Sequence, residues 1–276
     1  WLLLTVLLSS CYQNHVNTIL YPETRTDKSV SDNYFGTEVA DPYRWLEDDN
    51  SDETSQWVEA QNKITFTYLE NIPQRNAIKE RLTEIWDYEK VSAPFKRGGK
   101  YYFYKNEGLQ NQSVLYSSDE LRGEEKVILD PNIFSEDGTV ALSGTYFNHE
   151  GNLLGYAKSI GGSDWKEFYI KDLSTGEDRK DHLQWIKFSG MAWAGDGFYY
   201  SRYPKPEEGG ELDASNENAK VYYHQLGTEQ KMDNLIFSDA NNLQISNNIS
   251  TTDDENYAVL YRWKGTSGTA LYIAPV

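Results

Sequence analysis

The sequence predicts a mainly β protein, an incomplete β-propeller that follows an N-terminal helical segment. A short aromatic-rich run recurs four times at intervals of roughly 50 residues, and a second run follows each one after about ten to fifteen residues. Aromatic and branched residues in runs bounded by Gly, Asp, Asn and Ser favour strands over helices. A period of about 40 to 50 residues with several strands per unit is typical of propeller blades. The pairs are Tyr101–Tyr104 with Val114–Tyr116, Leu153–Ala157 with Phe168–Ile170, Phe198–Ser201 with Val221–Tyr223, and Tyr257–Tyr261 with Ala270–Ile273.

Turn residues separate the predicted strands. Asp137-Gly138 and Glu150-Gly151 stand ahead of the second of the first runs, and Asp196-Gly197 stands ahead of the third. We expect the first runs to be the inner strands of their blades. Glycine tolerates the positive φ that a tight reversal requires. An antiparallel sandwich remains an alternative, since strands spaced at about 8 to 12 residues suit that fold too.

The first 20 residues predict a truncated export leader. Trp1–Leu8 is almost wholly apolar but too short to span a bilayer, and no Met or basic residue precedes it. Leu8-Ser9-Ser10-Cys11 resembles the bacterial lipobox, and Cys11 is the sole cysteine in the sequence. We therefore expect an exported, periplasmic protein that a lipid on Cys11 anchors to a membrane. The alternative, a buried strand with a chance cysteine, leaves the abrupt change to polar residues at Tyr12 unexplained.

Residues 21–87 are predicted to form a helical segment, and residues 88–276 four propeller blades. One helix begins near Ser51 or Asp52, because Asn, Ser and Asp are natural caps and apolar residues then recur at helical spacing. Pro73 opens a second helix. The apolar stripes are Trp57, Ile64 and Tyr68 on the first helix and Ile78, Leu82, Ile85 and Trp86 on the second.

Composition excludes several classes of function. The formal charge of −17 is dispersed along the chain and repels phosphate backbones and anionic lipid, so nucleic acid is not an expected partner. The sequence contains no Gly-x-Ser-x-Gly motif for a hydrolase nucleophile, and its four histidines are scattered. It has no Cys/His cluster for zinc and no Gly-rich phosphate loop.

One acidic pattern resembles a calcium loop. Asp48, Asn50, Asp52 and Glu59 occupy positions 1, 3, 5 and 12, but position 6 is Glu53 where the loop requires Gly. Acids in the first turn of a helix, where they favour its dipole, account for the pattern. No metal or cofactor is therefore predicted.

Five segments, in order, resemble the prolyl oligopeptidase family of serine peptidases, and the likeness runs from about Tyr21 to the end of the chain. They are DPYRWLEDDNSDETSQWVEAQNKI at Asp41–Ile64, LQNQSVLY at Leu109–Tyr116, LDPNIFSEDGTVAL at Leu129–Leu142, GSDW at Gly162–Trp165 and KFSGMAW at Lys187–Trp193.

The resemblance implies a seven-bladed propeller inserted into an α/β-hydrolase domain. Residues up to about 87 would then pack on the hydrolase domain, and residues 88–276 would be the first four blades. The catalytic Ser, Asp and His would lie in a later segment that these residues do not include, so this part alone is expected to be inactive. The implied reaction is hydrolysis of short peptides after proline, with the propeller as a filter and the complete protein as a monomer. A non-catalytic binding propeller is the alternative, because fold does not fix activity.

The resemblance also implies three substrate-binding residues. Phe188 matches an aromatic that adds apolar surface beyond the proline pocket, and Asp164 matches an acid that could steer an arginine of the hydrolase domain. Arg262 lies one residue before a family arginine of the fourth blade, whose place Trp263 takes in an ungapped alignment. Strand neighbours point to opposite faces, so this one-residue offset leaves open which of the two faces the tunnel. From context alone these residues would be a core residue, a turn residue and a solvated side chain.

Overall fold

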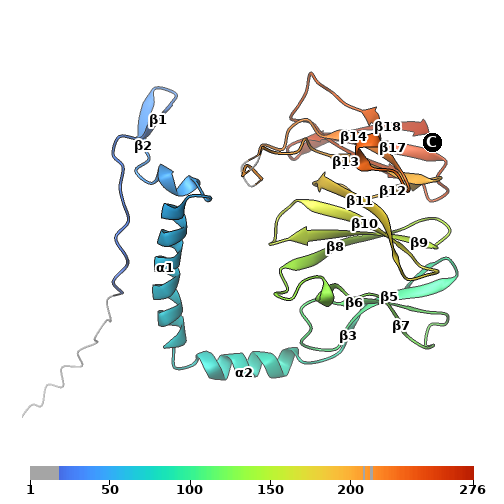
Figure 1. Ribbon diagram of the computed structural model, residues 1–276, viewed down its shortest axis with the longest axis horizontal. Helices are drawn as coiled ribbons and strands as arrows, with labels where there is room; N and C mark the ends of the chain where they lie inside the picture. The colour runs from blue at the N-terminus through green and yellow to red at the C-terminus, as the bar shows by residue number, and fades with distance from the viewer. Residues whose placement is uncertain (1–18, 208, 212–213) are drawn as a thin grey trace, which may run out of the picture. The chain divides into compact units, whose positions relative to one another are not determined.

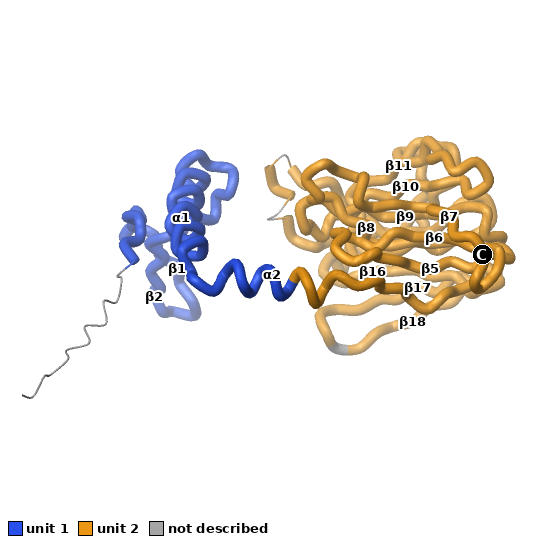
Figure 2. Tube along the Cα trace, turned by 90° about the horizontal axis from the view of Figure 1, so that it is seen from below, with its two compact units in different colours: residues 1–82 blue, residues 83–276 orange. Residues whose placement is uncertain are grey.

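The computed structural model describes residues 19–207, 209–211 and 214–276, so the predicted leader with Cys11 lies outside the described residues. The chain divides into two compact units between Leu82 and Thr83 (Figure 2). Neither of the α-helices that the structure describes is both long and apolar enough to cross a membrane.

The first unit contains a small hairpin and two helices, with the elements β1 (Ser31–Tyr34), β2 (Thr37–Ala40), η1 (Arg44–Glu47), α1 (Asp52–Glu70) and α2 (Arg75–Trp86, which runs into the second unit). The predicted helix start at Ser51 or Asp52 is confirmed, because the Ser51 hydroxyl accepts the Thr54 N–H at 3.2 Å as an N-cap. Thr54 is the sole buried residue within these two helices, and the apolar stripe of α2 is exposed.

The second unit consists of four antiparallel sheets of consecutive strands, stacked one after another (Figure 1). Because no strand of the described part pairs outside its own sequential group, the propeller prediction is confirmed and the sandwich alternative is wrong. The first sheet has β3 (Lys90–Val91), β4 (Phe95–Arg97), β5 (Lys100–Asn106), β6 (Val114–Ser118) and β7 (Lys126–Leu129), and the short helix η2 (Pro131–Ile133) follows it. The second sheet has β8 (Val140–Phe147), β9 (Leu153–Ile160), β10 (Lys166–Asp172) and β11 (Asp178–Ile186). The third sheet has β12 (Ala192–Ala194), β13 (Gly197–Arg202), β14 (Lys220–Gln225) and β15 (Asn234–Phe237), with the short helix η3 (Gln230–Met232) before β15, and the fourth has β16 (Ser246–Thr251), β17 (Tyr257–Lys264) and β18 (Ser267–Pro275).

The aromatic runs are not the inner strands, so that expectation is wrong. They form the second strand of each sheet, β5, β9, β13 and β17, and their partner runs form the third. Middle strands lie between neighbouring sheets on both faces and become apolar on both sides. The strands that precede them are broken in the first sheet and only three residues long in β12, so they lack a recognisable apolar run.

Three apolar clusters fill the spaces between successive sheets. The largest joins the second and third sheets, where Phe168 of β10 lies at 6.5 Å from Phe198 and 6.3 Å from Tyr200, measured between ring centroids. The Trp193 indole N–H of β12 donates to the Tyr146 carbonyl of β8 at 3.0 Å. Adjacent blades therefore share one core and are tied by a partly buried hydrogen bond.

A buried histidine adds a charged contact between the same two sheets. His224 of β14 is fully buried, with Nδ1 at 2.7 Å from Asp233 and Nε2 at 3.1 Å from Asp181 of β11. Burial lowers the pKa of His224, but hydrogen bonds and charge from the two carboxylates outweigh it and raise the pKa to about 9. The imidazolium therefore donates to both carboxylates at neutral pH, and the Tyr200 hydroxyl donates to the second oxygen of Asp233 at 2.6 Å.

The antiparallel meander gives the stack two distinct ends. A chain that enters a four-stranded sheet at one end also leaves it there. The end that carries the links between sheets, together with the loops between second and third strands, is called the crossover end. The opposite end, with the turns between first and second strands, is called the hairpin end.

Candidate functional site at the crossover end of the propeller

All three substrate-binding residues expected from the sequence lie at the crossover end. Phe188 is in the link from β11 to β12, Asp164 is in the loop from β9 to β10, and Arg262 is near the last residue of β17. The topology thus brings three separate segments to one end of the stack. Their role in binding stays a prediction.

Phe188 is presented outward by its two neighbours. Lys187 and Ser189 on either side are buried, and the Ser189 hydroxyl accepts the Ser201 N–H at 2.8 Å. Phe188 takes a left-handed φ of 52° and is 47% exposed, so it is not the core residue that its context alone predicts. Its ring meets the buried Tyr203 edge-to-face, with centroids 6.5 Å apart.

Asp164 is held in an exposed position by the residues that flank it. The Ser163 hydroxyl accepts the Trp165 N–H at 3.2 Å, and the Trp165 indole N–H donates to the Glu211 carbonyl at 2.7 Å. The carboxylate between them is exposed at the crossover end. At this position the carboxylate is accessible to a partner that approaches the crossover end.

Arg262 is already engaged within the propeller. Its Nε donates to the Asn247 side chain at 3.0 Å, its Nη2 pairs with Asp239, and its guanidinium lies 4.9 Å from the centre of the Phe237 ring. The pKa of Asp239 is lowered mainly by this hydrogen bond from Arg262. Arg262 therefore ties β17 to the link that precedes β16.

The register of β17 separates Arg262 from Trp263. Arg262 lies on the same face of β17 as Leu260 and Ala258, because side chains two residues apart on a strand point the same way. Leu260 and Ala258 both pack on the cluster between the third and fourth sheets. Arg262 therefore belongs to the face that meets the third sheet, and Trp263 belongs to the other face. Which of them contacts substrate stays a prediction.

Sequence reasoning missed an aromatic group beside Phe188. The rings of Trp165 and Trp185 meet edge-to-face at 5.5 Å, and Tyr203 lies 6.4 Å from Trp165. The ammonium of the buried Lys187 stands 4.0 Å from the Trp165 ring centre and 3.2 Å from the Asn216 amide oxygen. The available signal was the presence of large aromatics in loops and strand ends, where packing of a sheet does not require them.

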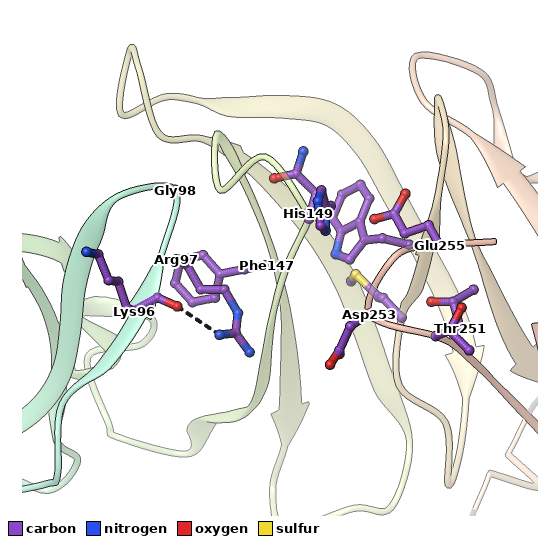
Figure 3. Close-up of a pocket in the computed structure, with 12 residues that line it drawn as sticks. Lys96, Arg97, Gly98, Phe147, His149, Thr251, Asp253 and Glu255 are labelled. Carbon is purple, nitrogen blue, oxygen red and sulfur yellow. Dashed lines mark hydrogen bonds between the residues drawn. The ribbon is translucent and has the colours of Figure 1, made fainter. Parts of the chain in front are cut away.

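A polar pocket of about 410 Å³ opens at the hairpin end (Figure 3). Lys96 and Arg97 of β4 line one side, and Asp253 and Glu255 of the β16–β17 turn line another. The Gly195 N–H donates to Glu255 at 3.3 Å, which joins two successive hairpin turns. The pocket therefore presents charges of both signs from the first and fourth sheets, an arrangement that no sequence motif indicated.

Metal binding has no ligand set in the described part of the chain, where no group of three or more His, Cys, Asp or Glu side chains could hold an ion. The Asp48 carboxylate of the calcium-like pattern accepts the Asn50 N–H at 3.2 Å, as in an ordinary turn before a helix.

Known proteins resemble this chain over most of its length. Residues 22–276 match the family model described as prolyl oligopeptidase, N-terminal beta-propeller domain. The prolyl endopeptidases of Elizabethkingia meningoseptica and Elizabethkingia miricola are 47% and 46% identical over 93% of the chain. The chain spans only 36% of the length of each of these relatives.

A solved structure gives the same result for the fold. Prolyl oligopeptidase B from Galerina marginata, as a variant bound to a 35-residue hydrolysis and macrocyclization substrate, superposes with a TM-score of 0.81 at 31% identity. The match covers 93% of this chain and 39% of that one. The sequence resemblance is confirmed, and the chain belongs to the prolyl oligopeptidase family, of which it carries the N-terminal β-propeller region.

Proposed function

We propose that this chain is the substrate-admitting part of a serine-type endopeptidase that cleaves short peptides after proline. The carrying observation is Phe188, an aromatic held half-exposed by two buried neighbours at the crossover end. The names of the relatives support the reaction class. Acyl transfer through a serine ester would use residues of the hydrolase domain, so the described propeller alone would bind peptide without cleaving it.

The same proposal assigns partners to two surfaces. Asp164 would attract a cationic side chain of the hydrolase domain, because its carboxylate is exposed at the crossover end. The exposed stripe of α2, with Ile78, Leu82, Ile85 and Trp86, would pack against an apolar surface of that domain. The complete protein would then act as a monomer with its own domains as partners.

The test uses the complete protein and a chromogenic peptide with proline before the reporter group. Cleavage that a serine-directed inhibitor abolishes is the expected result. Phe188→Ala should lower kcat/KM about tenfold, the scale of one aromatic contact, while Phe188→Leu should lower it less. Absence of cleavage by the wild-type protein would favour a non-catalytic binding propeller.

We propose an exported location as well, on the apolar Trp1–Leu8 run followed by Cys11. Metabolic labelling with a radioactive fatty acid should mark the wild-type protein and leave Cys11→Ser unlabelled. Equal labelling of both proteins would contradict the assignment of Cys11.

A further inference from the structure

An apolar cleft of about 340 Å³ opens at the crossover end of the second sheet. Its mostly apolar lining includes Ile160 at the end of β9, Trp165 before β10 and Trp185 near the end of β11. This volume is at the small end of ligand pockets, roughly 300 to 1,000 Å³, so it suits a few residues of an extended peptide.

The walls of the cleft are held in place before any ligand binds. The Trp165 indole N–H is fixed by the Glu211 carbonyl at 2.7 Å, and its ring is in contact with the Lys187 ammonium at 4.0 Å. The Trp165 and Trp185 rings meet at an interplanar angle of 81°. A slot of fixed aromatic walls costs a ligand little conformational entropy in the protein.

The polar groups of the cleft favour an uncharged occupant. Lys166, Glu167 and Glu211 give the lining charges of both signs. The Glu167 carboxylate is already satisfied, since it accepts from Gln184 at 3.0 Å and from Tyr169 at 2.6 Å and lies 2.9 Å from His182 Nε2. An uncharged ligand avoids the loss of hydration that an ion would suffer in this mostly apolar slot.

Proline fits these conditions better than other residues do. It has no backbone N–H to satisfy, its φ is fixed, and proline-rich segments adopt an extended polyproline II helix without prior ordering. Aromatic-lined slots are a recurring means of binding such segments.

The cleft adjoins the surface proposed to bind substrate. Tyr203 lies 6.4 Å from Trp165 and 6.5 Å from Phe188, and its N–H donates to the Trp185 carbonyl at 3.2 Å. We propose that the Trp165–Trp185 cleft is a distal binding site for a second proline-containing segment of a peptide substrate. This inference rests on the proposed prolyl endopeptidase function.

The test compares three synthetic peptides as substrates of the complete protein. One is a four-residue peptide with a single proline, one is a twelve-residue peptide with the same cleavage site and a distal Pro-Pro-Ala-Pro segment, and one has those distal prolines replaced by alanine. For cleavage at the shared site, the wild-type protein should prefer the distal proline peptide over its alanine version about tenfold in kcat/KM. Trp185→Ala should abolish that preference, and Trp185→Phe should retain most of it because a flat ring remains.

Two further variants guard against loss of folding. Ile160 is 55% exposed, so Ile160→Asp introduces a charge into the cleft without emptying the core, and it should also abolish the preference. Leu235, 53% exposed on β15, is the matched control, and Leu235→Ala should keep it. Thermal unfolding of each variant is measured alongside.

The outcomes separate this inference from the function on which it rests. Equal rates on the two long peptides by the wild-type protein, or an intact preference in both Trp185→Ala and Ile160→Asp, would overturn the distal site while cleavage of the short peptide upholds the endopeptidase. Failure to cleave any of the three peptides would overturn both.

Discussion

The propeller sheets and the N-terminal helices carry apolar patterns of similar clarity, but only the sheets bury them. Phe168 and Leu183 of the second sheet are fully buried, whereas Leu82 and Trp86 of α2 are 54% and 61% exposed. The strands find their partner surfaces in the next sheet along the chain. The stripe of α2 lacks such a sequential neighbour, so periodicity alone predicts the element and not its burial.

The largest expected difference between the two regions is in core truncation. Phe168→Ala removes a ring that contacts Tyr146, Phe198 and Tyr200, and should cost about 3 to 5 kcal/mol of unfolding free energy. In the chain without the hydrolase domain, where the stripe is exposed, Leu82→Ala should change it by about 0.5 kcal/mol or less. Urea unfolding measures both, and equal losses would mean that the helix stripe is as buried as the core.

The stability of the sheets, unlike that of the helices, should depend on pH through the buried His224. Its pKa of about 9 in the folded protein exceeds the ordinary value of 6.5, so its contribution to stability is complete below pH 6.5 and is lost as pH rises through 9. His224→Gln keeps one donor but leaves a buried carboxylate uncompensated, and should cost about 3 kcal/mol at neutral pH. Unfolding free energies at pH 6 and pH 10 should differ less in the variant, and an equal difference would exclude His224 as the titrating group.

A smaller effect is expected at the first turn of α1. Ser51→Ala removes the acceptor of the Thr54 N–H and should cost about 1 kcal/mol, while Ser51→Asp should restore the cap. Amide hydrogen exchange at Thr54 provides the local readout. Unchanged protection in Ser51→Ala would show that other contacts fix this turn.

The smallest effect on stability is expected at Asp164. Its side chain is exposed, so Asp164→Asn should alter the unfolding free energy by about 0.5 kcal/mol or less. In the complete protein at low salt, Asp164→Asn should have a lower kcat/KM than the wild type. At high salt the two values of kcat/KM should become similar, because salt screens exposed charges. A salt-independent loss would point to a local rearrangement instead of steering.

The sequence predicted most of the architecture because its signals are local. Aromatic runs, Asp-Gly turns and the Ser51 cap each act over a few residues, and the structure has the predicted strand and helix at each place. The edge strand β12 escaped detection because three residues carry no period, and the aromatic run was placed one strand too far inward.

The site was less predictable because contacts between distant segments define it. Arg262 and Asp239 are 23 residues apart, and Trp165 and Glu211 are 46 apart. Strand alternation correctly predicted that Arg262 and Trp263 point to opposite faces of β17. It could not predict which of these faces meets the third sheet. No local pattern carries that information.

The even count of strands in the second and third sheets has a consequence for variation in this family of folds. A blade of four strands returns the chain to the end where it entered. All links between such blades therefore lie at the crossover end, and a longer link changes that end and not the hairpin end. An insertion that added a single strand would reverse the direction of the strands in all blades beyond it. A change in the length of a loop such as the one between Arg202 and Lys220 therefore leaves the two ends of the stack as they are, whereas a change in the parity of the strands exchanges them.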